Sequence, residues 1–422
     1  MKKLLKSDFI RSIVLLTTGT ALAQVFNLAA SPFLTRIYSA EEMGELGLYM
    51  RIIGFLTVAA TLRYELAFPL PKRDNEAFLL YRLAFKYTKV ILIAISVGLG
   101  LYQLVFPADF SLVVLFALAI VSSLFVVFTN AGTSWSIRKG NFKPISKAKV
   151  INSGVANILK WSFGMFGWGS VGLMVASLIG FVVSSSYFIK DYFKMKSISP
   201  RYSPKRMTVL GRRYKDFPLV SFPHALIDVL RDLILGFCIA IVFSKAIFGY
   251  FNHSFIMLRL PLVLVGTSIG QVFFNRCSEM VNRGEDIYGL LKKTMVQLIG
   301  LSIIPFTLVF FFGEPLFSFV FGEEWGQAGK YSEIMAIWIG LNFINSPLSN
   351  IPMIINRQRE FFVLGLINTG IQLIGFLVLP YVIGNTEDDF ITILWIVSIT
   401  QAVFLAGVSL ITLYYSKQVK TR

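Results

Sequence analysis

The chain is dominated by apolar runs of about 20 residues, which recur along its whole length. Hydrophobic residues make up 55% of the 422 positions and charged residues 15%, whereas a soluble domain carries about 25% charged residues. A helix of about 20 residues crosses the hydrocarbon core of a bilayer. The strict apolar–polar alternation that a transmembrane β-barrel needs is absent from the sequence. The sequence therefore predicts an all-α polytopic membrane protein rather than a chain with one water-excluded core.

Twelve transmembrane helices are expected from these runs. The first is interpreted as a retained helix, because the apolar run from Ile13 to Leu34 is too long for a signal peptide and lacks a clean cleavage site. The predicted helices cover 10–35, 44–68, 83–106, 110–134, 148–167, 169–190, 220–243, 246–274, 292–312, 331–354, 361–383 and 390–415.

The basic residues predict the orientation of these helices. Of the 40 lysine and arginine residues, 32 fall at the termini and in loops on one side. The loops of the other side contain only Arg36, Lys245 and Lys330, and they carry acidic clusters instead. Because positively charged loops stay in the cytoplasm, both termini are expected to be cytoplasmic. This partition also explains the net charge of +17 without nucleic acid as a partner.

The remaining five cations lie at membrane depth, where a charge is costly and often marks a transport pathway. Arg63 lies close to a helix end, so it can reach the interface or pair with Glu65. The other four are Arg51, Lys160, Arg231 and Arg259, which are the candidate substrate-binding residues. The alternative is internal salt bridging, which suits Arg231 best.

Asp228, Arg231 and Asp232 stand at i, i+3 and i+4, so they share one helical face. The two aspartates are candidates for coupling to Na⁺ or H⁺, and the alternative is that they only hold Arg231 in place. Gln24 and Asn27 are candidate cavity-lining residues on the first helix, with an interhelical hydrogen bond as the equally weighted alternative.

A weak internal repeat predicts two halves. Residues 39–44 can be laid over residues 244–249 at a constant offset, and each segment is a short turn that opens a helix with glycine. We therefore expect a six-helix lobe at 1–190 and another at 220–422, around a central cavity. The charged segment 191–219 is the expected cytoplasmic loop between the lobes.

No catalytic or metal-binding pattern is present in the sequence. There is no GxxxxGK[ST] or HExxH motif, and no cysteine pair at metal spacing. Cys238 and Cys277 are expected to be buried hydrophobic residues, and His224 and His253 are too few and too far apart for a metal site. We therefore expect no enzyme activity and no cofactor.

Three segments resemble bacterial polysaccharide-repeat flippases of the O-antigen type. They are Leu34-Thr35-Arg36 with the Glu41–Gly44 turn, Phe248–Tyr250 running through Arg259-Leu260-Pro261, and Gly313–Phe317 running to Trp325. Met43 stands where phenylalanine is more usual in that family.

This family belongs to the multidrug/oligosaccharidyl-lipid/polysaccharide exporter superfamily. The resemblance implies alternating access, with undecaprenyl pyrophosphate carrying an oligosaccharide moved from the cytoplasmic to the periplasmic leaflet of the inner membrane. It also implies O-antigen or capsule synthesis as the process. Membrane lipids, a coupling ion and other polysaccharide-assembly proteins are the further partners that we expect.

Two other functions compete with this interpretation. A multidrug antiporter of the same superfamily would need an acidic cavity, whereas the deep cations outnumber Asp228, Asp232 and Glu65. A polysaccharide polymerase or lipid-linked glycosyltransferase would be expected to carry a large outer loop or a soluble catalytic domain, and the longest predicted loop is short and basic.

The charge partition predicts that Lys143 and Lys205 lie in the cytoplasm and that Glu323 and Asp388 lie outside. Single cysteines at these positions in a cysteine-free chain are treated with a membrane-impermeant thiol reagent on whole cells. We expect labelling at 323 and 388 only. Labelling at 205 without labelling at 388 would reverse the orientation.

Overall fold

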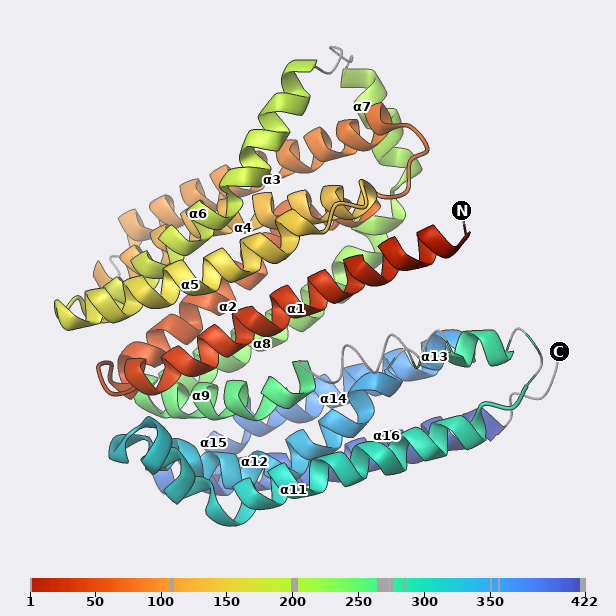
Figure 1. Ribbon diagram of the computed structural model, residues 1–422. Helices are drawn as coiled ribbons and strands as arrows, with labels where there is room; N and C mark the ends of the chain where they lie inside the picture. The colour runs from red at the N-terminus through yellow and green to blue at the C-terminus, as the bar shows by residue number, and fades with distance from the viewer. Residues whose placement is uncertain are drawn as a thin grey trace. The chain divides into compact units, whose positions relative to one another are not determined.

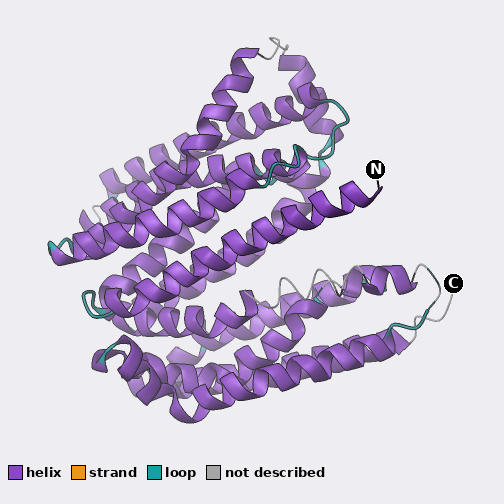
Figure 2. Ribbon diagram, viewed as in Figure 1, coloured by secondary structure: helices purple, strands orange, loops and turns teal. Residues whose placement is uncertain are grey.

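The structure is a computed structural model that describes residues 2–106, 110–198, 204–263, 273, 276–281, 283, 285–349, 351–355 and 357–417. All regular secondary structure in these residues is helical (Figure 2). The longer helices are α1 (Lys2–Leu34), α2 (Ala40–Thr61), α3 (Asp74–Val105), α4 (Phe110–Arg138), α5 (Lys143–Met165), α6 (Gly169–Ile198), α7 (Pro204–Arg213), α8 (Phe222–Val242), α9 (Lys245–Pro261), α11 (Tyr288–Phe321), α12 (Gly326–Asn345), α14 (Gln358–Leu377) and α16 (Glu387–Lys417). Short helices α13 (Ile351–Ile354) and α15 (Leu379–Ile383) flank α14 (Figure 1).

Each of the twelve predicted ranges overlaps a described helix, and the all-α polytopic membrane class is confirmed. Seven described helices are long and apolar enough to span a bilayer: α2, α3, α4, α6, α11, α14 with α15, and α16. The other predicted spans are α1, α5, α8, α9 and α12, of which α5, α8 and α9 contain Lys160, Arg231 and Arg259. Residues 264–272 and 274 of the predicted helix 246–274 lie outside the described residues.

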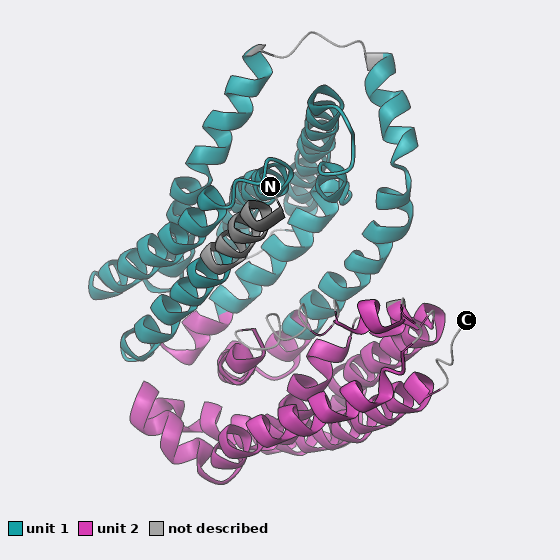
Figure 3. Ribbon diagram, turned by 45° about the vertical axis from the view of Figure 1, so that its right-hand side comes forward, with its two compact units in different colours: residues 1–38, 45–236 teal, residues 39–44, 237–422 magenta. Residues whose placement is uncertain are grey.

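The chain forms two compact units (Figure 3). Unit 1 contains residues 1–38 and 45–236, and unit 2 contains residues 39–44 and 237–422. The division therefore falls within α8 rather than at 220, and the two six-helix lobes stay a prediction. The expected loop 191–219 is largely helical where it is described, because α6 continues to Ile198 and α7 follows from Pro204.

Helices of unit 1 approach one another closely where one of them carries a small residue. A Cβ on Gly19 of α1 would lie 2.5 Å from Cβ of Ser146 on α5, and a Cβ on Gly132 of α4 would overlap the ring of Phe188 on α6. A Cβ on Gly180 of α6 would lie 2.9 Å from Cβ of Ala156 on α5. Small residues at these crossings are what packing in lipid requires, because apolar side chains gain nothing by leaving lipid for protein.

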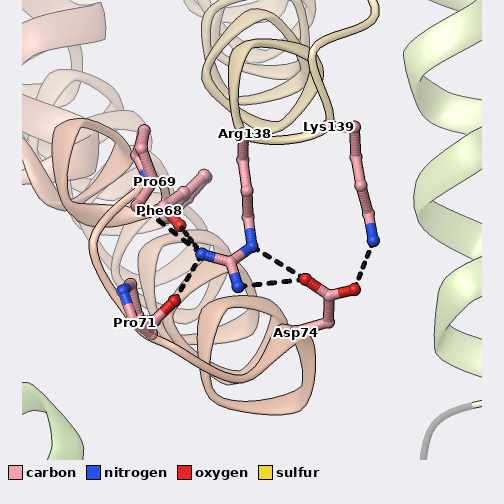
Figure 4. Close-up of polar contacts among 6 residues, drawn as sticks. All are labelled: Phe68, Pro69, Pro71, Asp74, Arg138 and Lys139. Carbon is pink, nitrogen blue, oxygen red and sulfur yellow. Dashed lines mark hydrogen bonds and ion pairs between the residues drawn. The ribbon is translucent and has the colours of Figure 1, made fainter. Parts of the chain in front are cut away.

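The connection from α2 to α3 is held by an arginine of α4 (Figure 4). Nη1 of Arg138 donates hydrogen bonds to the carbonyl oxygens of Phe68, Pro69 and Pro71, at 3.2, 3.2 and 2.6 Å. Its Nε donates to Oδ1 of Asp74 at 3.0 Å, and Lys139 pairs with the other oxygen of that carboxylate. One side chain thus provides hydrogen bonds for three backbone carbonyl groups of this connection.

The same connection begins with a strained turn. Leu62 and Arg63 both adopt the left-handed conformation, with φ of 49° and 62°. This turn places Glu65 in the interior, where it is 5% exposed. Nη1 of Arg63 lies 3.7 Å from Oε1 of Glu65, so the predicted pairing of these two residues is present. Burial raises the pKa of Glu65, although hydrogen bonding and Arg63 oppose this shift.

In unit 2, the two turns that the sequence analysis aligned as a repeat pack against each other. A Cβ on Gly249 of α9 would lie 1.8 Å from the carbonyl oxygen of Ala40, and a Cβ on Gly44 would lie 2.3 Å from that of Lys245. The contact is reciprocal, because each of these Cβ positions also lies 3.2 Å from the backbone nitrogen of the other glycine. Only glycine fits at either position.

Unit 2 also contains an apolar and aromatic core around Phe317, Phe321 and Trp325. His253 is buried between the rings of Phe321 and Trp325, each with its centroid 4.7 Å away. Both cysteines are buried and free, as the sequence predicts. Sγ of Cys238 donates to the carbonyl oxygen of Phe376 at 3.0 Å.

The reciprocal glycine contact predicts a specific stability loss. Gly249→Ala forces α9 away from Ala40, which should cost about 1–3 kcal/mol and lower Tm by roughly 5 °C. Gly54→Ala is the matched control, because a Cβ at Gly54 meets nothing within 4 Å. That control should keep or raise Tm, since alanine is the better helix former. Thermal unfolding of both purified variants in detergent is the measurement, and equal Tm values would contradict the contact.

Candidate functional site

A polar cavity of about 400 Å³ lies within unit 1, between α1, α2, α5 and α6. Its apolar lining comes from Ala23, Met50, Ala156 and Phe181. Its polar lining consists of Thr20, Gln24, Asn27, Lys149, Asn152, Ser153, Asn157, Lys160 and Ser177. No carboxylate is present in the described lining. A cavity of this size within a helical membrane domain can hold part of a polar ligand.

Helix α5 supplies the charged wall of this cavity. Lys149, Ser153, Asn157 and Lys160 stand at i, i+4, i+8 and i+11, so they follow one face of the helix. Figure 1 shows α5 running alongside α1, and the two helices are in contact along their length. The polar face of α5 therefore faces α1 and the cavity rather than lipid.

A seam of hydrogen bonds joins α1 to α5. Ser153 Oγ lies 2.8 Å from the carbonyl oxygen of Ala23 and 2.5 Å from Oδ1 of Asn27. Nδ2 of Asn157 donates to the same Oδ1 of Asn27 at 2.8 Å. Asn27 thus makes the interhelical hydrogen bond that was the alternative for this residue. Asn27 and Gln24 also line this cavity of unit 1, and a central cavity between two lobes stays a prediction.

Two lysines bring positive charge to the cavity. Nζ of Lys149 donates to Oγ1 of Thr20 at 2.9 Å. Lys160 forms no ion pair with any carboxylate among the described residues, and its carbonyl oxygen accepts from the hydroxyl of Tyr38 at 2.7 Å. Oδ1 of Asn152 is buried and has no hydrogen-bond partner in the described part of the chain. The cavity therefore offers cationic groups and an unused acceptor together.

Arg51 does not line this cavity, although its neighbour Met50 does. The Arg51 side chain lies against α8, where its Nη1 donates to the carbonyl oxygen of Asp232 at 2.6 Å. Gly236 provides the room, because a Cβ there would lie 2.7 Å from Cδ of Arg51.

Arg231 forms the internal salt bridges that the sequence analysis left open as an alternative. Its Nη2 lies 3.0 Å from Oδ1 of Asp232, and its Nη1 lies 3.9 Å from Oδ1 of Asp228. Nδ1 of His224 lies 3.9 Å from the second oxygen of Asp228. The Arg231 side chain is 20% exposed, whereas both aspartate side chains are more than half exposed. In this arrangement the charge of Arg231 is already balanced.

Arg259 belongs to unit 2 and the other three predicted cations to unit 1. Arg259 lies in the last turn of α9, and its guanidinium carbon is 4.9 Å from the ring centroid of Phe255. Such a contact stabilises a cation in a place of low polarity. Among the described residues, no three His, Cys, Asp or Glu side chains gather as metal ligands.

Several residues that line this cavity are not among the predicted site residues. They include Lys149, Asn152, Ser153 and Asn157, all of which fall in the predicted helix 148–167. The available signal was the spacing of polar residues from Lys149 to Lys160, which continues one helical face through an otherwise apolar segment.

The α1–α5 seam predicts energetic coupling between Asn27 and Ser153. In a double-mutant cycle with Asn27→Ala and Ser153→Ala, the coupling free energy should be about 0.6–1.7 kcal/mol. Ser162→Ala is the control, because Ser162 bonds only to the carbonyl oxygen of Ile158 on its own helix. Unfolding titrations in mixed micelles give the free energies. If the coupling free energy of Asn27→Ala with Ser153→Ala is no larger than that of Asn27→Ala with Ser162→Ala, the hydrogen bonds between α1 and α5 do not contribute as proposed.

Comparisons with known proteins agree with this architecture. A sequence model of the family Polysaccharide biosynthesis protein matches residues 33–330. No curated protein matches the chain. Among solved structures, the lipid II flippase MurJ in an inward closed conformation is similar with a TM-score of 0.74 and 14% identity, over 96% of this chain and 87% of that one.

Two further solved structures are multidrug and related transporters. An inward-facing multidrug resistance MATE family transporter of the MOP superfamily is similar with a TM-score of 0.69 and 15% identity, over 97% of this chain and 98% of that one. A MOP superfamily transporter from Pyrococcus furiosus, whose binding pocket has reversed polarity, is similar with a TM-score of 0.56 and 14% identity, over 99% and 97%. At such identities the likeness is one of fold. The chain belongs to the polysaccharide biosynthesis protein family and has the fold of MOP superfamily transporters.

Proposed function

We propose that this protein is a flippase for undecaprenyl-pyrophosphate-linked oligosaccharide repeat units. It moves them by alternating access from the cytoplasmic to the periplasmic leaflet of the bacterial inner membrane, for O-antigen or capsule synthesis. Membership of a polysaccharide biosynthesis family and a fold shared with a lipid II flippase support this proposal. The proposed activity is transport and involves no chemical step.

The observation that carries the proposal is the polarity of the cavity in unit 1. Its described lining combines Lys149 and Lys160 with amides and hydroxyls and contains no carboxylate. A lysine at membrane depth costs about 3 kcal/mol on insertion scales, and a bound anion would offset that cost. Amide and hydroxyl groups suit sugar hydroxyls, because both can donate and accept hydrogen bonds. The cavity therefore fits a ligand that is anionic at one end and rich in hydroxyls.

The same polarity argues against the multidrug antiporter. A cationic drug would lose its hydration in the cavity and find lysines in place of carboxylates. The two carboxylates of α8, Asp228 and Asp232, are already engaged by Arg231.

The charge cluster on α8 has a separate part in this proposal. A pyrophosphate group would compete with Asp228 and Asp232 for Arg231, because guanidinium binds two phosphate oxygens at once. The released aspartates would then take up Na⁺ or a proton, which couples cargo to an ion gradient. Arg51 and Arg259 complete the set of cations that we assign to the pyrophosphate.

Lys160 gives the sharpest test of the anion cavity. Lys160→Gln should reduce surface polysaccharide by about tenfold or more in a deletion strain, because about 1.4 kcal/mol of lost binding is a factor of ten. Lys160→Arg should retain part of the activity. The matched control is Lys147→Gln, since Lys147 lies on the same helix and does not line the cavity.

Polymer is quantified relative to the protein in the membrane, and lipid-linked oligosaccharide is assayed in each leaflet. We expect the intermediate to accumulate on the cytoplasmic side with Lys160→Gln. Normal polymer with that variant, or export of a cationic dye that depends on the protein, would overturn the proposal.

A further inference from the structure

A second basic site lies away from the cavity, where helix α7 packs on α3. Arg206, Leu210 and Arg213 stand at i, i+4 and i+7 on α7, so they share one face. Leu210 is 7% exposed and fixes this face against unit 1. Gly211 permits the approach, because a Cβ there would lie 2.9 Å from Cδ2 of Leu83 on α3. The hydroxyl of Tyr64 donates to the carbonyl oxygen of Gly211 at 3.3 Å, which fixes α7 further.

Arg206 and Arg213 of α7, together with Arg73 just before α3, line a cleft of about 220 Å³. The polar lining is Arg73, Asn75, Glu76, Arg206 and Arg213, and the apolar lining is Leu79, Val209 and Leu210. Three guanidinium groups therefore face one carboxylate. Neither Arg73 nor Arg213 forms an ion pair in the described part of the chain. Arg73 and Arg213 thus leave the cleft with positive charge that no described carboxylate pairs.

The place of this cleft indicates which anion it holds. Arg73 directly precedes α3, whose residues Asp74–Val105 form a candidate membrane span. Val209 lines the cleft and is 66% exposed, and Leu219, shortly after α7, is also exposed. Guanidinium groups beside exposed apolar side chains at the end of a transmembrane helix match the boundary between phospholipid headgroups and acyl chains.

We propose that this cleft binds the phosphate of an anionic bilayer phospholipid, such as phosphatidylglycerol, through Arg73, Arg206 and Arg213. Basic pockets between membrane helices bind such headgroups. Val209 contacts the upper part of the acyl chains. The lipid thereby holds α7 at the membrane surface. This site shares no lining residue with the cavity in unit 1, so it is independent of the proposed cargo.

The test compares two variants of the full chain that lose the same charge. The cleft variant is Arg73→Gln/Arg206→Gln/Arg213→Gln. The control is Lys72→Gln/Lys205→Gln/Arg212→Gln, in which each position is the sequence neighbour of a cleft arginine, is exposed and does not line the cleft. Native mass spectrometry of detergent-purified protein measures binding of phosphatidylglycerol and of phosphatidylcholine with the same acyl chains.

We expect the cleft variant to bind phosphatidylglycerol at least about tenfold more weakly than the original protein, and the control to change by less than about twofold. Phosphatidylcholine should bind weakly to all three proteins. An equal loss in both variants would overturn the proposal in favour of diffuse surface charge. Displacement of phosphatidylglycerol by micromolar inorganic pyrophosphate would overturn it in favour of a site for soluble anions. If the triple variant unfolds, Arg73→Gln and Lys72→Gln are compared as the single-residue pair, with the same opposed outcomes.

Discussion

The candidate site depends on the close approach of α1 and α5. Apolar packing alone gives little reason for two helices to associate in lipid, so they need small residues and shared hydrogen bonds. Gly19 brings the backbones together at Ser146, and Ser153 then reaches both a carbonyl of α1 and Asn27. Ser153 and Asn157 on the polar face of α5 form hydrogen bonds with α1. The other polar residues of that face, among them Lys149 and Lys160, line the cavity. Lys160 therefore keeps its place at membrane depth without a protein carboxylate.

The described cations fall into two groups, those paired with a carboxylate and those without such a partner. Arg138 and Arg231 have carboxylate partners, and Arg138 also donates hydrogen bonds to three backbone carbonyl oxygens. Such groups are stabilised whether or not a ligand is present. Lys160, Arg73 and Arg213 form no ion pair with a carboxylate in the part of the chain that the structure describes. An anion can bind such unpaired cations directly, whereas at Arg231 it must first displace the carboxylates of Asp228 and Asp232.

The helical class and the positions of the long apolar helices could be predicted, because run length is a local property of the sequence. The polar face of α5 could not be assigned, because Lys149 stands at the start of the predicted helix 148–167, where a loop and a span are alike in composition. In the structure α5 begins earlier, at Lys143. Helix α7 was missed because a short, strongly charged segment forms a helix here only by packing on Leu83 and Tyr64. The salt bridges of Arg231 were foreseeable from spacing alone, but the choice between pairing and ligand binding depends on rotamers that spacing does not determine.

The reciprocal contact of Gly44 with Gly249 bears on how the chain is made. These residues are 205 positions apart, so at 5–20 residues per second roughly 10 to 40 s pass between their synthesis. During that interval the first turn of α2 is already in the nascent protein while its partner has not yet left the ribosome. Unit 2 contains residues 39–44, and its core can therefore close only after α9 arrives. Until then, residues 39–44 have to be accommodated by the membrane-insertion machinery or by lipid.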